Sequence, residues 1–229
     1  MIRQATKADI DAIAQTYEDL LTFEERNGTK SNWKLGLYPT KSVAIQRVGL
    51  GEMYVLEEDG QISASMALNR EQAEEYAGID WKYYAPPESV LVIHTLCIPP
   101  QRAGHGYGKQ MIAYAKTFAA EIGCKVIRID TWAHNEPAKR LYLKNGFRIA
   151  GYGPILLQRL IPEEQVYLEY LICRHRKSAG QAAEKSFSKA IIKIRCLQAL
   201  ESENDRKEEN SHDNSRQESS HRRAEEAEC

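Results

Sequence analysis

The chain has 229 residues, of which 42% are hydrophobic and 28% are charged, and its formal net charge is −1. This length allows one domain of common size plus an appendage, and the apolar content is sufficient for a buried core. A charge this close to zero gives no bulk-charge argument for binding nucleic acid or a membrane surface, so we expect neither partner.

The cysteines and the N-terminal segment indicate a cytoplasmic protein. The five cysteines stand at irregular positions, without the C-x-x-C spacing of many metal sites. We therefore expect reduced thiols and no bound metal. The N-terminal segment leads directly into a polar helix pattern and lacks the apolar stretch of a signal peptide, and no apolar run approaches the length of a membrane span.

The first part of the chain combines two helix patterns with three strand patterns. Thr6 with Asp9 three residues later is a capping signal for the first helix, and Thr40 is a cap for the second. The turn at Gly60 separates two strands in the manner of a hairpin. The expected elements are a strand at 2–5, a helix to about 23, a helix at 40–50, strands at 53–57 and 62–68, and a loop at 70–88.

The second part of the chain alternates strand and helix patterns. Its first strand is apolar enough to be a central buried strand of a sheet. The expected elements are strands at 90–98 and 125–131, a helix reaching about 122 between them, a helix at 137–144, a strand after Phe147, and a last strand at 165–171.

The tail at 172–229 has a different composition. From Ser202 onward it is dominated by polar and charged residues, which cannot bury enough surface to offset chain entropy. We therefore expect a disordered, low-complexity tail. Apolar residues recur at helical spacing at about 181–200, which predicts an amphipathic helix that docks on the domain, on a partner or on a lipid surface.

A glycine-rich segment connects the predicted central strand to the next helix and is suited to gripping a phosphate. Glycines leave backbone N–H groups accessible at the positive end of a helix. The dinucleotide-binding and P-loop patterns fail, because Lys109 replaces the third glycine of one and Ala103 the first glycine of the other. The shorter pattern Q/R-x-x-G-x-G/A fits, with Gln101, Gly104 and Gly106 at its fixed positions.

A second block, at 135–147, matches N-x-x-A-x-x-L-Y-x-x-x-G-F at every fixed position. Together the two blocks resemble the GNAT superfamily, the Gcn5-related N-acetyltransferases, over roughly residues 1–171. The resemblance implies the GNAT α/β (α+β) fold, a mixed, mostly antiparallel sheet of roughly six to seven strands with helices on both faces. It also implies that the two parallel strands around the glycine turn splay apart and admit the cofactor's pantetheine arm.

The activity that the resemblance implies is N-acetyl transfer from acetyl-CoA to a primary amine of a small molecule or peptide. The amine attacks the thioester directly, through a tetrahedral intermediate, so no covalent acyl-enzyme is required. For the assembly of the protein we allow for a homodimer. The alternative from a different class is a non-catalytic acyl-CoA-binding module that senses cofactor and uses the tail as an interaction arm.

The resemblance places the cofactor along the glycine turn, the preceding strand and the second block. Backbone N–H groups of the turn would hold the pyrophosphate, and a backbone N–H near Leu96 would polarise the thioester carbonyl. Asn135 is equally suited to capping the helix that follows it. The residues expected at the cofactor are Leu96, Cys97, Ile98, Gln101, Arg102, Ala103, Gly104, His105, Gly106, Tyr107, Gly108, Lys109, Asn135 and Tyr142.

The chemistry requires an acid for the departing thiolate and a base for the attacking amine. The resemblance implies that Tyr142 is the general acid, and a core aromatic is the structural alternative. His94 is the first candidate base, because it stands two residues from Leu96 and is expected on the same strand face. Asp130 is the second candidate. Weaker carboxylate candidates are Glu24, Glu25, Glu71, Glu74 and Glu75.

The acceptor is less well indicated by the sequence. Aromatic side chains and carboxylates together suit a cationic amine, although the same aromatics could simply pack a long loop onto the sheet. The aromatic residues in question are Trp33, Tyr38, Trp81, Tyr83 and Tyr84.

Overall fold

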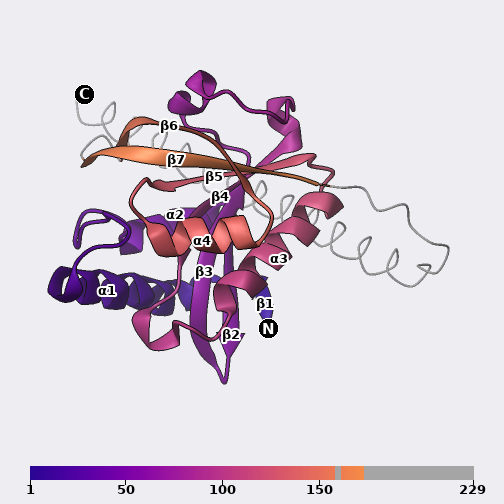
Figure 1. Ribbon diagram of the computed structural model, residues 1–229. Coiled ribbons are helices and arrows are strands. Elements are labelled where there is room, and N and C mark those ends of the chain that lie inside the picture. Colours follow the sequence, from indigo (N-terminus) through magenta and orange to yellow (C-terminus); the bar gives the residue numbers. More distant parts are fainter. Residues whose placement is uncertain (158–160, 173–229) are drawn as a thin grey trace, which may run out of the picture. The chain divides into compact units, whose positions relative to one another are not determined.

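The computed structural model describes residues 1–157 and 161–172 (Figure 1). All of the predicted tail except its first residue, including the amphipathic helix at about 181–200, lies outside the described residues. The domain boundary at 171 stays a prediction.

A single seven-stranded sheet forms the centre of the described chain, with the strand order β1-β2-β3-β4-β5-β7-β6. Every neighbouring pair is antiparallel except β4 and β5, which are parallel. This arrangement confirms the predicted mixed, mostly antiparallel sheet. The strands are β1 (Ile2–Gln4), β2 (Met53–Glu58), β3 (Gln61–Asn69), β4 (Val90–Cys97), β5 (Val126–Trp132), β6 (Arg148–Leu157) and β7 (Ile161–Leu171).

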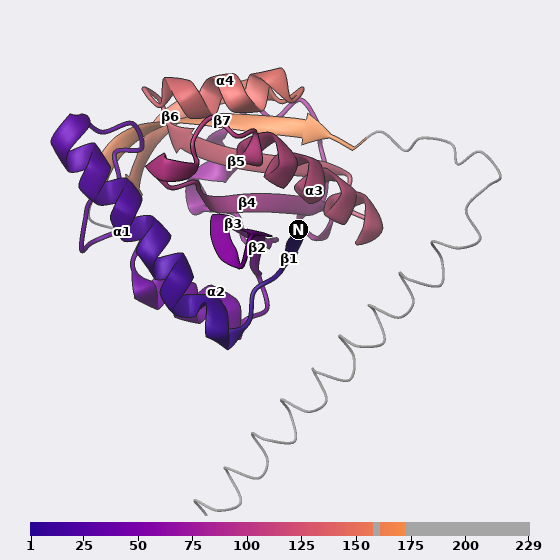
Figure 2. The ribbon, with the colours of Figure 1, turned by 90° about the horizontal axis from the view of Figure 1, so that it is seen from below.

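Helices cover both faces of the sheet, as predicted. In Figure 2, α3 and α4 lie on one side of the strands, and α1 and α2 lie on the other. The α-helices are α1 (Ile10–Asn27), α2 (Lys41–Gly49), α3 (Tyr107–Glu121) and α4 (Glu136–Lys144). The short 3-10 helices are η1 (Lys7–Asp9), η2 (Glu74–Gly78), η3 (Pro87–Ser89) and η4 (Pro100–Arg102).

The larger core lies between the sheet and the pair α3 and α4. Met111 and Ala115 stand four residues apart on α3, so they share the helix face that turns toward the sheet. They pack in one cluster with Leu91 and Ile93, alternate residues of β4. Each fully buried aliphatic side chain of this kind contributes about 1.5–3 kcal/mol relative to exposure. This packing fixes α3, the helix that follows the glycine turn, against β4.

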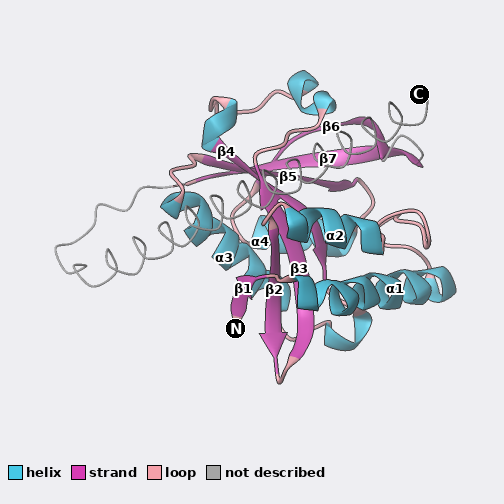
Figure 3. Ribbon diagram, turned by 180° about the vertical axis from the view of Figure 1, so that it is seen from behind, coloured by secondary structure: helices cyan, strands magenta, loops and turns pink. Residues whose placement is uncertain are grey.

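The opposite face is covered by two separate clusters. Ile13 and Tyr17 of α1 pack with Ala44 of α2 over the first strands, and Figure 3 shows both helices on this side of the sheet. Beyond them, the segment 70–88 covers the rest of the face. This segment was predicted as a plain loop, but it contains η2 and η3.

A buried carboxylate of β7 helps to hold segment 70–88 to the sheet. Glu169 of β7 is fully buried and accepts hydrogen bonds from the backbone N–H groups of Lys82 and Tyr83, at 2.9 and 3.1 Å. It also pairs with the Arg148 guanidinium. Side-chain contacts of this kind keep the segment over the sheet.

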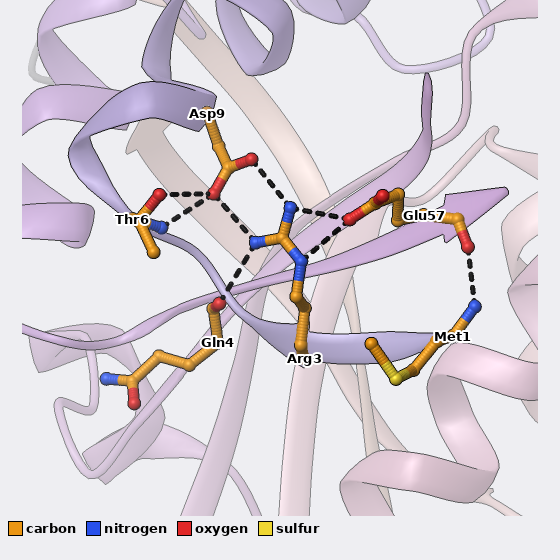
Figure 4. A network of polar contacts seen from close by, with 6 residues as sticks. All are labelled: Met1, Arg3, Gln4, Thr6, Asp9 and Glu57. Atoms are coloured by element: carbon orange, nitrogen blue, oxygen red, sulfur yellow. Dashed lines mark hydrogen bonds and ion pairs between the residues drawn. The ribbon is translucent and has the colours of Figure 1, made fainter. Parts of the chain in front are cut away.

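An arginine cluster ties the entry of the first helix to the sheet (Figure 4). The Arg3 guanidinium donates to both oxygens of Asp9, at 2.7 and 2.8 Å, and to Glu57 at 2.8 Å. Asp9 also accepts from the backbone N–H and the hydroxyl of Thr6, at 2.7 and 2.9 Å. The predicted capping signal is therefore present, although the first turn is 3-10 in form.

Two element ends differ from the prediction. The first helix continues to Asn27 and ends before Gly28, whose φ of 88° suits glycine. The last strand begins at Ile161 and not at Gln165, because it pairs with β6 from Leu157 onward. The hairpin between β6 and β7 is thus longer than its sequence pattern suggested.

Candidate active site

The parallel strands β4 and β5 separate along their length. They pair only from Val90 with Val126 to Val92 with Arg128, and both strands continue beyond these residues. A cavity of about 880 Å³ is lined by residues from the unpaired parts of both strands. The splay that the family resemblance implied is therefore present, and residues on both of its sides line this cavity.

A bulge interrupts β4 at the edge of this cavity. Thr95 has a φ of +51°, in the left-handed region, and the register between β3 and β4 shifts opposite it. The extra residue breaks the alternation of side chains. Leu96 consequently packs in the core cluster of Ile93, together with Ile98, and His94 contacts Asn69.

The prediction that His94 and Leu96 share a strand face is therefore wrong, because the bulge lies between them. The side chains next to the bulge lie on opposite sides of the sheet. Leu96 and Ile98 are partly buried and pack against the core cluster on one side. Cys97 is a buried free thiol on the other side, where its Sγ donates to the Thr16 carbonyl at 3.6 Å and burial raises its pKa to about 12.

The glycine turn presents a row of free backbone donors. The N–H groups of Arg102 and Ala103 already donate to carbonyls within η4, at 2.9 and 3.1 Å. Gln110 is the first residue of α3 to donate backward, to Gly106 at 3.2 Å. Within the part of the chain that the structure describes, the N–H groups of 104–109 make no backbone hydrogen bond. The unpaired backbone donors of the turn therefore lie at 104–109 and exclude those of Arg102 and Ala103.

Glycine is required in the turn for backbone conformation. Gly104 and Gly106 have φ values of 82° and 77°, which side chains rarely adopt, and a Cβ at either would meet no atom within 4 Å. Gly108 serves packing instead, since a Cβ there would lie 2.8 Å from Leu141 of α4.

The side chains of the turn mostly make structural contacts. Arg102 donates to Gln61, and the buried Tyr107 donates from its hydroxyl to Glu58. His105 stacks on Tyr107 with ring centroids 5.5 Å apart. The remaining predicted residues Gln101 and Lys109 are exposed.

The second motif forms α4 and faces the cavity. Asn135 caps the helix by accepting from the Ala138 N–H at 3.2 Å, as its capping interpretation predicted, and donates to Thr131 at 3.1 Å. Tyr142 is buried and lines the cavity. Its hydroxyl makes no hydrogen bond to another described residue, and burial raises its pKa above the usual range of a phenol.

The two candidate bases lie on the other side of the sheet from α4, and both line the cavity. Asp130 accepts a hydrogen bond from the Tyr76 hydroxyl at 2.6 Å, and burial raises its pKa. His94 has its Nε2 2.9 Å from the Asn69 side-chain oxygen, and burial together with the nearby Arg47 lowers its pKa to about 4.

Some of the remaining candidate carboxylates and aromatic residues line the cavity, and the others lie away from it. Glu24, Glu74 and Glu75 line the cavity, as do Trp33 and Tyr38. Glu25 and Glu71 do not. Of the three other aromatics, Trp81 and Tyr83 pack against the sheet and Tyr84 is exposed, so none of them lines the cavity.

No sequence pattern indicated Thr95, Tyr76 or Gln165, which also line the cavity.

The prediction of no bound metal rested on cysteine spacing. Among the described residues, no group of three histidine, cysteine or acidic side chains is arranged to hold a metal ion. None of the described helices has both the length and the apolar character needed to span a membrane.

The model of the Acetyltransferase (GNAT) family matches residues 14–147, which contain both motifs and both splayed strands. This chain belongs to the GNAT family. It is therefore an acetyl-CoA-dependent acyltransferase, and acetyl-CoA is its co-substrate.

Individual relatives agree with the family assignment. The uncharacterized N-acetyltransferase YhfO of Bacillus subtilis is 24% identical over 150 residues, which are 64% of this chain and 88% of that protein. An acetyltransferase of the GNAT family from Listeria monocytogenes superimposes with a TM-score of 0.58 at 20% identity, covering 75% of this chain and 94% of its own. The protein yncA from Salmonella typhimurium, solved with its cofactor acetyl-CoA, gives 0.54 at 19% identity, covering 79% and 98%.

Proposed function

We propose that the chain transfers the acetyl group of acetyl-CoA to a primary amine of a small molecule or peptide by direct attack of the neutral amine. The observation that carries this proposal is the cavity at the β4–β5 splay, which is lined by Tyr142 on one side of the sheet and by Asp130 on the other. An acid and a base thus face one hollow from opposite sides. No cysteine needs to act as a nucleophile, since the buried Cys97 thiol has a raised pKa.

The glycine turn fits the pyrophosphate of acetyl-CoA. Backbone N–H groups of 104–109 are unpaired among the described residues and stand at the positive end of α3. The open space beside Gly104 and Gly106 leaves the backbone approachable. The backbone of β4 from Leu96 to Ile98 would hold the pantetheine amides, and one oxyanion donor there would contribute about 3 kcal/mol.

Tyr142 is proposed as the general acid for the departing thiolate. Because burial raises its pKa, the phenol stays protonated across the physiological range and has a proton to donate. Since no described residue accepts a hydrogen bond from its hydroxyl, the proton is free to point into the cavity.

Asp130 is proposed as the base in preference to His94. Its carboxyl lines the cavity, its pKa is raised by burial toward the pH at which proton transfer is efficient, and Tyr76 fixes one oxygen. His94 is disfavoured as the base, because burial and Arg47 lower its pKa to about 4 and its Nε2 already contacts Asn69.

The test compares wild type with Tyr142→Phe in a free-thiol release assay against a panel of primary amines. We expect kcat to fall by about tenfold or more, while acetyl-CoA affinity in calorimetry is kept, because only the acid is lost. Tyr152→Phe is the matched control, since Tyr152 is 49% exposed on β6 and does not line the cavity. Unchanged turnover in Tyr142→Phe would remove this residue from the chemistry.

The family assignment favours an enzyme over the non-catalytic acyl-CoA-binding module, which makes a different prediction. Wild type would then bind acetyl-CoA without releasing thiol in the presence of any amine of the panel. The same two measurements therefore separate the two functions.

A further inference from the structure

One carboxylate in the cavity has no role in the proposed chemistry. Glu24, near the end of α1, is only 6% exposed and lines the cavity. Its Oε2 accepts three hydrogen bonds: from the Thr29 hydroxyl at 2.9 Å, from the Ser31 hydroxyl at 2.6 Å and from the Ser31 N–H at 3.2 Å. These donors hold the carboxylate in one orientation, and Oε1 receives no hydrogen bond from a described residue.

No cation neutralises this carboxylate within the described chain. Glu24 takes part in no ion pair there, although other carboxylates near the cavity do. Two basic side chains line the same cavity, Arg47 and Lys30. The Arg47 guanidinium already binds Glu52 and Glu71, at 2.6 and 2.8 Å, and the exposed Lys30 forms no ion pair with Glu24. A buried charge without a partner is costly, and in proteins it is normally paired or bound to a ligand.

A second residue of the cavity wall, Gln165, also has a side-chain oxygen without a hydrogen-bond donor among the described residues. Gln165 of β7 is 3% exposed and lines the cavity, and its Oε1 has no hydrogen-bond partner among the described residues. Its amide nitrogen is engaged with Glu163. Glu24 and Gln165 therefore each have one side-chain oxygen that accepts no hydrogen bond from a described residue, and acceptors of this kind suit a ligand rich in N–H groups.

An aromatic wall lies between Glu24 and the bulge in β4. The backbone N–H of Trp33 donates at 3.1 Å to the Ser31 hydroxyl, which itself donates to Glu24. The Trp33 ring packs edge-on against Tyr38, with centroids 5.7 Å apart, and Tyr38 bonds Thr95 at 2.7 Å. Aromatic faces of this kind suit alkyl chains and ammonium groups.

We propose that the acceptor is a diamine or polyamine, in which one amine is acetylated at the β4–β5 splay and Glu24 binds a second, protonated amine. This inference rests on the proposed N-acetyl transfer and adds the substrate class. The ammonium group donates to Glu24 Oε1, and the carbon chain between the two amines lies along Trp33 and Tyr38. A monoamine fills the reactive end and leaves Glu24 unpaired.

The test uses the full chain, acetyl-CoA and amines matched in length. Putrescine and cadaverine are compared with butylamine and pentylamine, which lack only the second amine, and kcat/KM is measured by thiol release. A charge-assisted hydrogen bond predicts a diamine preference of about tenfold or more in the wild type. Equal values for each matched pair would overturn the proposal without any variant being made.

The variant Glu24→Gln tests the residue. It keeps the shape and one acceptor oxygen for Ser31 but removes the charge, so the ratio of diamine to monoamine kcat/KM should fall to about one. Glu25→Gln is the matched control, because Glu25 is the next residue on α1, is exposed and lies outside the cavity. It should keep the wild-type ratio, and an equal loss of preference in both variants would assign the effect to bulk charge and overturn the role of Glu24.

Measurements of binding and of turnover together distinguish a failure of the diamine assignment from a failure of N-acetyl transfer. Calorimetry with coenzyme A present should give tighter binding of cadaverine than of pentylamine to wild type, and not to Glu24→Gln. If pentylamine or a peptide is acetylated as well as the diamines, the diamine assignment fails and N-acetyl transfer stands. If no amine is acetylated while acetyl-CoA binds, both the proposed function and this inference are wrong.

Discussion

The hydroxyl groups of Tyr38 and Thr95 lie 2.7 Å apart, which ties the loop after α1 to the bulge in β4. Thr95 is β-branched and sits at a φ of +51°, a conformation that costs of the order of 1–3 kcal/mol. The hydrogen bond offsets part of that cost. It also joins the aromatic wall of the cavity to the point where β4 leaves β5.

This relationship predicts non-additive effects on stability. Tyr38→Phe and Thr95→Val each remove the same hydrogen bond with little change of shape, so each should lower the free energy of unfolding by about 1 kcal/mol. The double variant should lose little more than either single variant. Urea denaturation of the four proteins measures the coupling, and fully additive losses would mean that the two hydroxyls act independently.

The glycine turn predicts a separation of binding from stability. Gly106→Ala places a Cβ at a φ of 77°, which should cost about 1 kcal/mol and disturb the N–H groups at the start of α3. We expect acetyl-CoA affinity in calorimetry to fall by about tenfold, equivalent to about 1.4 kcal/mol.

Gly123→Ala is the control for that experiment. Gly123 has the same φ of 77° and equally open space, but it follows the other end of α3. It should lose similar stability and keep its affinity for acetyl-CoA. Equal losses of affinity in both variants would point to general destabilisation and against the phosphate assignment.

The sequence was sufficient for the strands, the helices, the glycine turn and the helix cap at Asn135, and the cofactor contacts of these residues stay a prediction. Local signals carried these predictions, because the glycine turn and the cap at Asn135 depend on residues that are near neighbours in the chain. Apolar periodicity in β4 and α3 then predicted which elements are buried.

The part of the cavity expected to bind the amine substrate could not be predicted in the same way. The bulge at Thr95 arises from the pairing of β4 with β3, so it has no local signal, and it reverses the face expected for His94. Tyr76 and Asp130 meet across 54 residues of chain. Contacts between such distant segments follow from tertiary packing alone.

The packing of α3 on α4 predicts the effect of a single methyl group. A Cβ at Gly108 would lie 2.8 Å from Leu141 Cδ2 and 3.2 Å from Ile98 Cδ1. Gly108→Ala should therefore cost about 1–3 kcal/mol of unfolding free energy by overpacking. Adding Leu141→Ala should recover part of the loss, because it makes room for the methyl group. Thermal melts of the single and double variants check this, and an unrelieved loss would place the strain elsewhere.

The Arg3 cluster predicts a loss of stability in acid. The hydrogen bonds from the Arg3 guanidinium hold the pKa of Asp9 well below its usual range. Because the folded pKa is the lower one, this stabilisation is full above the unfolded pKa of about 3.9 and is lost as the pH falls below it. Asp9→Asn should cost about 2 kcal/mol at neutral pH and much less near pH 2. Urea midpoints at the two pH values measure this, and an equal cost at both would contradict it.

The two candidate bases should respond to different measurements. Asp130→Asn should lower kcat/KM for an amine by about a hundredfold, because it removes the proposed base, whereas His94→Gln should lower it by less than about tenfold.

His94 should instead affect the stability of the fold. Its folded pKa of about 4 lies below the unfolded value of about 6.5, so its stabilisation is complete above about pH 6.5 and is lost as the pH falls toward 4. His94→Gln should remove that part of the pH dependence, on the order of 2 kcal/mol, in urea titrations between these two pH values. A hundredfold kinetic loss in His94→Gln, with Asp130→Asn still active, would reverse the two assignments.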